Sequence, residues 1–96
     1  MTSKERAYLR AKANTIDAIF QVGKGGITPE LLKQLDNAIE ARELIKISIL
    51  ETAPASSKEL AEEIASGTNS MVVQTIGNKI TLFRQKKKDS KFELPN

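Results

Sequence analysis

The sequence predicts a single compact domain of the α/β (α+β) class, with helices covering one mixed sheet of about four strands. Its 96 residues fall within the usual size of one domain. Apolar residues make up 40% of the chain, which is enough for a modest core. Segments with helical spacing of apolar residues alternate with segments of β-type alternation. The predicted order is helix, strand, helix, strand, helix, strand, strand.

The first half of the chain predicts two helices with a strand between them. Residues 4–14 contain strong helix formers, and Ser3 stands where an N-cap is needed. In residues 16–22, Ile16, Ala18, Phe20 and Val22 alternate with Asp17, Ile19 and Gln21, a pattern typical of a half-buried strand. Thr28 and Pro29 then supply an N-cap and a first helical residue. The helix that follows has an apolar stripe of Leu31, Leu32, Leu35, Ala38 and Ile39.

The middle of the chain predicts a second strand and a third helix. Residues 44–50 are rich in β-branched residues, with Ile45, Ile47 and Ile49 on one side. We expect these isoleucines to meet the apolar stripe of the preceding helix in one core. The third helix is capped by Ser56 or Ser57 and is expected to end at Gly67.

The last third predicts a hairpin and a tail. Residues 71–76 and 79–84 read as strands joined by Gly77–Asn78, a turn that needs residues tolerant of positive φ. We therefore place the domain at residues 1–85 and expect residues 86–96 to form a basic, mobile tail that folding does not need.

Composition argues against catalysis and against a metal or cofactor. Histidine and cysteine are both absent, which removes the usual general base, thiolate nucleophile and metal ligands. Glu62 and Glu63 are expected to form a solvated helix face instead. The lack of cysteine suits a reducing cytoplasm. No stretch approaches the roughly 20 apolar residues of a membrane span, so neither secretion nor membrane insertion is expected.

The net charge of +3 is unevenly distributed along the chain. Residues 30–63 are acidic on balance, whereas both ends are basic. Such polarity suits a polyanion partner, although lysine-rich ends can also serve only to solubilise a protein. The basic residues of the two ends are Lys4, Arg6, Arg10 and Lys12, then Lys79, Arg84, Lys86, Lys87, Lys88 and Lys91.

A glycine-rich loop at residues 23–26 is the most informative local motif. It joins a predicted strand to the helix that begins at Thr28 and Pro29. Glycines let the backbone approach a ligand closely, and the loop amides, the helix N-terminus and Lys24 would then converge on a phosphate. The spacing matches neither a Walker A loop nor a dinucleotide fingerprint. The alternative is that the glycines serve only the geometry of a turn.

Five segments in this order resemble one known family. They are Arg-Ala-Tyr-Leu-Arg at 6–10, Val-Gly-Lys-Gly-Gly-Ile-Thr at 22–28, Glu-Leu-Ile-Lys-Ile at 43–47, Val-Gln-Thr-Ile-Gly-Asn at 73–78 and Leu-Phe-Arg at 82–84. Together they resemble the CRM (chloroplast RNA splicing and ribosome maturation) domain in its stand-alone, bacterial YhbY-like form. The resemblance implies a fold similar to the C-terminal domain of translation initiation factor three. It also implies RNA binding and association with precursors of the large ribosomal subunit.

The resemblance also assigns residues. It places a Gly-x-x-Gly loop on residues 23–26, a basic first helix on Arg6 and Arg10, and a strand lysine on Lys46. Asn14 and Arg42 stand where relatives often carry histidine, and Arg42 can still contact phosphate. With the basic ends added, the predicted RNA-binding set is Gly23, Lys24, Gly25, Gly26, Lys4, Arg6, Arg10, Lys46, Lys79, Arg84, Lys86, Lys87 and Lys88.

The sequence therefore predicts a monomeric RNA-binding protein that assists assembly of the large ribosomal subunit. Its expected partner is structured RNA, either ribosomal RNA or the subunit precursor, and no small-molecule substrate is expected. Two other function classes stand beside this prediction. One is a protein-interaction adaptor that uses the acidic middle of the chain, and the other is a small enzyme.

Overall fold

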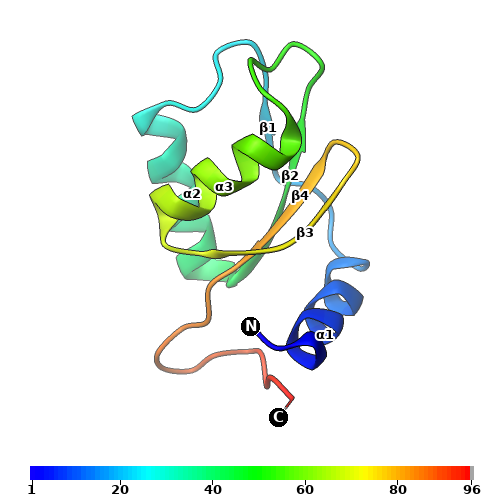
Figure 1. Cartoon of the computed structure of the whole chain (residues 1–96). Coiled ribbons are helices and arrows are strands. Elements are labelled where there is room, and N and C mark those ends of the chain that lie inside the picture. The colour runs from blue at the N-terminus through cyan, green and yellow to red at the C-terminus, as the bar shows by residue number, and fades with distance from the viewer. Residues whose placement is uncertain (96) are drawn as a thin grey trace.

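A computed structural model describes residues 1–95 of the chain. The predicted order of elements and the compact α+β class are confirmed (Figure 1). The elements are α1 (Ser3–Ala13), β1 (Phe20–Val22), α2 (Pro29–Arg42), β2 (Leu44–Ile49), α3 (Ser57–Thr68), β3 (Met71–Ile76) and β4 (Lys79–Phe83).

The four strands form one mixed sheet in the order β1-β2-β4-β3. β1 runs parallel to β2, with Phe20 opposite Ile47, and α2 makes the crossover between them. β2 and β4 are antiparallel, with Ile45 opposite Leu82. β3 and β4 form the predicted hairpin, in which Gly77 has a φ of 56°. β2 and β4 thus form the interior of the sheet.

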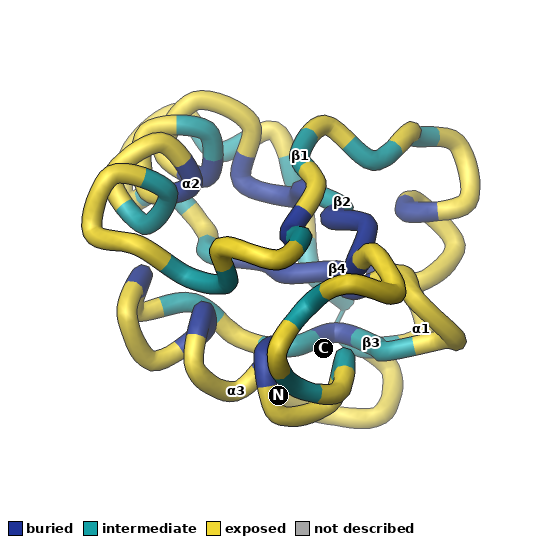
Figure 2. Tube along the Cα trace, turned by 90° about the horizontal axis from the view of Figure 1, so that it is seen from above, coloured by how far each residue is buried: buried dark blue, intermediate teal, exposed yellow. Residues whose placement is uncertain are grey.

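The main core lies between the sheet and the two helices α2 and α3. Ile45 and Ile47 from β2 are buried there with Leu35 and Ile39 from α2, as the sequence predicts. Figure 2 shows the buried positions gathered along β2 and β4, with the outer sides of the helices exposed. Leu32 differs from the prediction because its side chain is only half-buried and lies beside Gly67.

A smaller core covers the opposite face of the sheet, under α1. Leu9 and Ala13 of α1 are buried there against Leu44, Val73 and Phe83 of the strands. Successive residues of a strand point to opposite faces. Leu44 and Ile45 therefore serve different cores, and the sheet is sandwiched between α1 on one side and α2 with α3 on the other.

The N-terminal elements begin at positions other than those predicted. Thr2, not Ser3, caps α1: its hydroxyl accepts from the Glu5 amide at 3.1 Å, and its amide donates to the Glu5 carboxylate at 2.8 Å. These hydrogen bonds lower the pKa of Glu5. The first strand starts at Phe20 rather than at residue 16. The Ile16 carbonyl accepts a hydrogen bond from the Lys46 ammonium at 3.1 Å, and the Ile16 amide donates to the Ala13 carbonyl at 3.2 Å, so both backbone groups are bound outside the sheet.

The third helix continues past its predicted end. α3 runs through Gly67 to Thr68 and is capped by Asn69, which has a left-handed φ of 53°. A Cβ at Gly67 would lie 3.0 Å from the Leu32 side chain. Glycine at this position therefore allows α2 and α3 to pack closely and does not terminate the helix.

After β4 the chain turns back toward the N-terminus. Phe92 and Leu94 pack against the smaller core, so the two ends of the chain lie near each other (Figure 1). The molecule is elongated, with principal extents of 39 × 24 × 21 Å. Among residues 1–95, no helix has the length and apolar character that crossing a bilayer requires.

Candidate nucleic-acid interface

The glycine-rich loop connects the end of β1 to the start of α2. The Gly26 amide donates to the Gly23 carbonyl at 2.9 Å, which closes the loop as a tight turn. Gly26 has a φ of 64°, a conformation that strains any residue with a side chain. Thr28 caps α2 as predicted, its hydroxyl accepting from the Leu31 amide at 3.1 Å.

Two of the three glycines have a structural reason to be glycine, and the third has none. A Cβ at Gly23 would lie 3.2 Å from Leu50 Cδ1, and one at Gly26 would lie 3.0 Å from Pro54 Cγ. Gly25 is exposed, has no positive φ, and would have no atom within 4 Å of an added Cβ. The fold does not account for Gly25, whereas close approach of a ligand to the backbone would.

The loop can offer an anion one ammonium and a few amide donors. Lys24 is exposed, and within residues 1–95 its ammonium takes part in no ion pair. Its amide and that of Gly25 donate to no carbonyl of that range. The N-terminus of α2 contributes less than the sequence suggests, because Thr28 already binds one free amide and Glu30 places a carboxylate in the first turn. Anion binding would therefore rest on Lys24 and the loop itself.

The basic first helix contains cations of two kinds. Lys4 and Arg10 are exposed on α1. Arg6 points into the protein, where its guanidinium donates to the carbonyl of Val72 at 2.8 Å and also to that of Val73. These carbonyls lie at the irregular register between Val72 and Gln74, which indicates a β-bulge in edge strand β3. Arg6 therefore fastens α1 to the sheet.

Two more predicted contacts, Lys46 and Lys79, are also engaged within the chain. The Lys46 ammonium donates to the Ala13 carbonyl at 2.8 Å, which ties the end of α1 to β2. The Lys79 ammonium donates to the hydroxyl of Ser48 on the neighbouring strand at 2.6 Å. Both lysines stabilise the face of the sheet on which α1 lies.

Arg84 makes more internal contacts than the other predicted cations. Its guanidinium lies 2.6 Å from the Asp36 carboxylate and 3.1 Å from that of Glu40. It also donates to the Thr68 carbonyl at 2.6 Å. The two carboxylate contacts are the only ion pairs within the described part of the chain, and they link the end of β4 to α2, whereas the hydrogen bond to Thr68 links it to α3.

The C-terminal segment, residues 85–95, is held by a carboxylate that sequence reasoning did not single out. Glu43 is 0% exposed. Its carboxylate accepts from the amide of Lys86 at 2.9 Å, from the amide of Lys91 at 2.8 Å and from the hydroxyl of Ser90. Farther along, the Phe92 ring packs edge-on against Phe83 with 5.4 Å between centroids. The segment predicted to be a mobile tail thus makes specific contacts with the domain.

The charge of Glu43 depends on these contacts. Burial raises the pKa of its carboxyl group, but the hydrogen bonds from Lys86, Ser90 and Lys91 and the nearby Lys86 ammonium outweigh burial. The net pKa is lower than the ordinary value. In the sequence, Glu43 appears only as an acidic residue directly before an apolar strand. That pattern does not predict a buried carboxylate that binds a distant segment.

The structure places the predicted RNA-binding residues at two ends of the molecule. Figure 1 shows the glycine loop beside the connection between β2 and α3 at one end, and α1 with both termini at the other. Lys87 and Lys88 are exposed near the second end, where they line a hollow with Glu40 and Asn69. The loop and the basic termini therefore do not form one continuous site, and the RNA-binding role of each residue stays a prediction.

Comparison with known proteins gives a consistent picture. The family model for the CRS1 / YhbY (CRM) domain matches residues 1–84. The probable RNA-binding protein YqeI of Bacillus subtilis is 44% identical over 95 residues, and the match covers 99% of each chain. An RNA-binding protein of Haemophilus influenzae is 26% identical over 95 residues, or 99% of this chain and 95% of the relative.

A solved structure supports the fold over nearly the whole chain. The solution structure of SAV1595 from Staphylococcus aureus aligns with a TM-score of 0.83 at 45% sequence identity. The alignment covers 99% of both chains. The C-terminal segment of this chain thus lies within the aligned region.

Proposed function

The chain belongs to the CRS1 / YhbY (CRM) family, and from this premise we propose that it is a non-enzymatic RNA-binding protein. Both curated relatives described above have names that refer to RNA binding. We further propose that its RNA is structured ribosomal RNA and that it assists assembly of the large ribosomal subunit in the cytoplasm. The family resemblance of the sequence motifs supports this finer assignment.

One observation carries the proposed RNA contact: Gly25 is a glycine without a structural reason, next to an exposed lysine. Its backbone is open to solvent on a turn that Gly23 and Gly26 hold in place. A phosphate at this position would meet the Lys24 ammonium and free loop amides together. The glycine loop is therefore proposed as a phosphate-binding element of the protein.

Apart from Lys86, which is half-buried and whose amide binds the Glu43 carboxylate, the predicted cations fall into two groups by their internal contacts. Arg6, Lys46, Lys79 and Arg84 hold the fold together through hydrogen bonds to neighbouring groups. We assign phosphate contacts to the exposed cations instead, because an RNA need not compete with internal partners for them. These are Lys4, Arg10, Lys24, Lys87 and Lys88.

Titration of RNA at several salt concentrations tests this assignment. Lys24→Ala and Arg10→Ala should each weaken binding and reduce the slope of log affinity against log salt by about 0.7–0.9, the value for one phosphate contact. Lys33→Ala, which removes an exposed lysine from the outer side of α2, is the matched control. If both variants fold and bind structured ribosomal RNA as the parent does, the assignment is wrong.

Sedimentation of cell extract through a sucrose gradient tests the ribosomal part of the proposal. The protein should migrate with precursors of the large subunit, and it should leave them as salt is raised. An adaptor that docked on protein through α2 and α3 need not show steep salt dependence, because it would release no counterions from phosphate. If the protein sedimented only in the fractions that contain free protein, and not with ribosomal particles, the result would contradict a role in ribosome assembly.

A further inference from the structure

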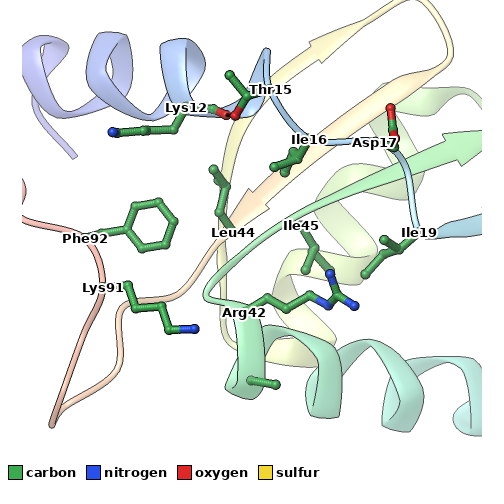
Figure 3. Close-up of a pocket in the computed structure, with 11 residues that line it drawn as sticks. Lys12, Thr15, Ile16, Asp17, Ile19, Arg42, Leu44, Ile45, Lys91 and Phe92 are labelled. Atoms are coloured by element: carbon green, nitrogen blue, oxygen red, sulfur yellow. Dashed lines mark hydrogen bonds between the residues drawn. The ribbon is translucent and has the colours of Figure 1, made fainter.

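A groove of about 530 Å³ lies between the end of α1, the end of α2 and the C-terminal segment. Its walls include three cations, Lys12 from α1, Arg42 from α2 and Lys91 from the C-terminal segment (Figure 3). The predicted RNA-binding set includes none of them, although Lys12 and Lys91 belong to the basic ends and Arg42 can contact phosphate. We call this hollow the tail groove.

The positive charge of the tail groove is not neutralised by the protein. Within residues 1–95 the only ion pairs are those of Arg84, so none of the three groove cations has an acidic partner. Lys12 instead places its ammonium 5.5 Å from the centre of the Tyr8 ring. Among the described residues 1–95, Asp17 is the one acidic side chain that lines the groove. Three cations around one carboxylate favour an anionic occupant.

The floor of the groove is apolar. Ile16, Leu44 and Phe92 line it, and Figure 3 shows Phe92 and Lys91 on one side of Leu44 with Asp17 on the other. A volume of several hundred Å³ with an apolar floor and a few charged groups is typical of small-ligand sites. An occupant that suits it has a flat apolar part and a negative charge, as a nucleotide does.

The wall formed by the C-terminal segment has a defined position. Glu43 holds the amide of Lys91, and Phe92 rests edge-on against Phe83. The backbone at both groove residues is therefore fixed from the buried side, whereas the Lys91 side chain stays exposed. The groove is thus part of the fold and depends on the Glu43 carboxylate.

We infer that the tail groove receives one unpaired nucleotide of the bound RNA. The base would lie against Phe92 and Leu44, and the flanking phosphates near Arg42 and Lys91. A fully paired helix keeps its bases stacked inside, so it cannot reach the apolar floor, whereas a bulged nucleotide can. This inference rests on the proposed RNA-binding function and adds to it a preference for RNA with an unpaired residue.

Two RNA hairpins that differ only by one bulged uridine provide the test. The full-length protein should prefer the bulged hairpin, and Phe92→Leu should weaken its binding about tenfold, because leucine keeps an apolar contact with Phe83 but loses base stacking. The double variant Arg42→Gln/Lys91→Gln should also lose this preference. Its matched control is Lys33→Gln/Lys58→Gln, which removes two exposed lysines outside the groove.

The outcomes separate this inference from the proposed function. Equal affinity of the parent for both hairpins, or a preference that survives in both groove variants, would overturn nucleotide capture. In either case, weaker binding by Lys24→Ala would leave the proposed function intact. If the parent bound neither hairpin nor ribosomal RNA, the proposed function itself would fail. Ser90→Ala supplies a further measurement, since it loosens the wall without removing a cation and should reduce only the preference for the bulge.

Discussion

Glu43 shows how one residue between two elements can organise a distant segment. It ends α2 with a φ of 68° and donates its amide to the Ile39 carbonyl at 2.7 Å. Glycine is the usual residue for a left-handed position after a helix. The sequence did not predict a positive φ at this glutamate, because the groups that donate hydrogen bonds to its carboxylate lie more than 40 residues later in the chain. The carboxylate explains why a glutamate occupies this position, because it accepts hydrogen bonds from Lys86, Ser90 and Lys91.

Glu43→Gln should reduce the free energy of unfolding at pH 7 by about 1.5–3 kcal/mol, because a neutral amide accepts these hydrogen bonds less strongly. The folded-state pKa of Glu43 is lowered, so its contribution is complete above the unfolded-state pKa of about 4.3 and is lost as pH falls through the folded value. Denaturant melts at pH 7, 5, 4 and 3 should show parent and variant converging at low pH. A constant difference across that range would contradict the anchoring role of the charge.

The glycine loop permits a comparison between neighbouring positions. Gly26→Ala should destabilise the protein by about 1–2 kcal/mol, since the left-handed φ and the contact with Pro54 both resist a Cβ. Gly25→Ala should melt at or slightly above the parent temperature, because nothing in the fold opposes the methyl group.

Gly25→Glu extends the comparison to binding. It should fold like the parent but bind RNA more weakly, because it blocks the backbone and repels phosphate. Thermal melts beside RNA titrations check both parts. A large loss of stability in either Gly25 variant would show that the position is structural.

At the scale of elements, local signals predicted well what local forces determine. The Thr28–Pro29 start of α2, the isoleucine alternation of β2 and the Gly77 turn each depend on residues adjacent in sequence. The start of β1 and the end of α3 were misplaced because distant contacts decide them. Before β1, the Lys46 ammonium donates a hydrogen bond to the Ile16 carbonyl. Near the end of α3, the Leu32 side chain packs against Gly67.

The same distinction limits prediction of the site. Charge patterning showed that both ends of the chain are basic, but it could not show that Arg6 and Arg84 are engaged with Val72 and Asp36. Those partners lie 48 or more residues away in sequence. From the sequence alone, an exposed cation cannot be distinguished from a cation that links two elements of the fold.

The C-terminal segment is the element whose predicted role changes most. Deleting residues 86–96 should lower the free energy of unfolding by about 2–4 kcal/mol, because it uncovers Phe83 and removes the donors to Glu43. The control Lys87→Ser/Lys88→Ser removes exposed charge only, so it should keep parental stability and lower RNA affinity. A truncated chain as stable as the parent would restore the view that folding does not need this segment.

The whole molecule is electrically divided. The helices α2 and α3, with their acidic residues, cover one face of the sheet. On the other side of the sheet, α1 and the C-terminal segment bring both basic ends of the chain together (Figure 1). The glycine loop lies at the far end of a molecule whose longest extent is 39 Å. An RNA that contacts both ends must therefore run along the long axis of the protein.

This separation predicts a dependence on RNA length. On a helix of about 16 base pairs, a length comparable to one double-stranded RNA-binding footprint, Lys24→Ala and Lys87→Ser/Lys88→Ser should both weaken binding, and their effects should add. A hairpin of about 6 base pairs can engage only one end, so its salt slope should be smaller. Fluorescence anisotropy with both RNAs checks this. Equal slopes would indicate a single contact region.

The position of the Glu43 anchor has a consequence for the order of events during synthesis. Lys91 follows Glu43 by 48 residues, which at about 5–20 residues per second corresponds to roughly 2–10 s of translation. During that interval the nascent chain can pair β1 with β2, but the carboxylate at the end of α2 has no donors and stays hydrated. Residues 86–91, which are synthesised after β4, thus complete the domain, and a chain that stopped after β4 would leave this carboxylate unpaired.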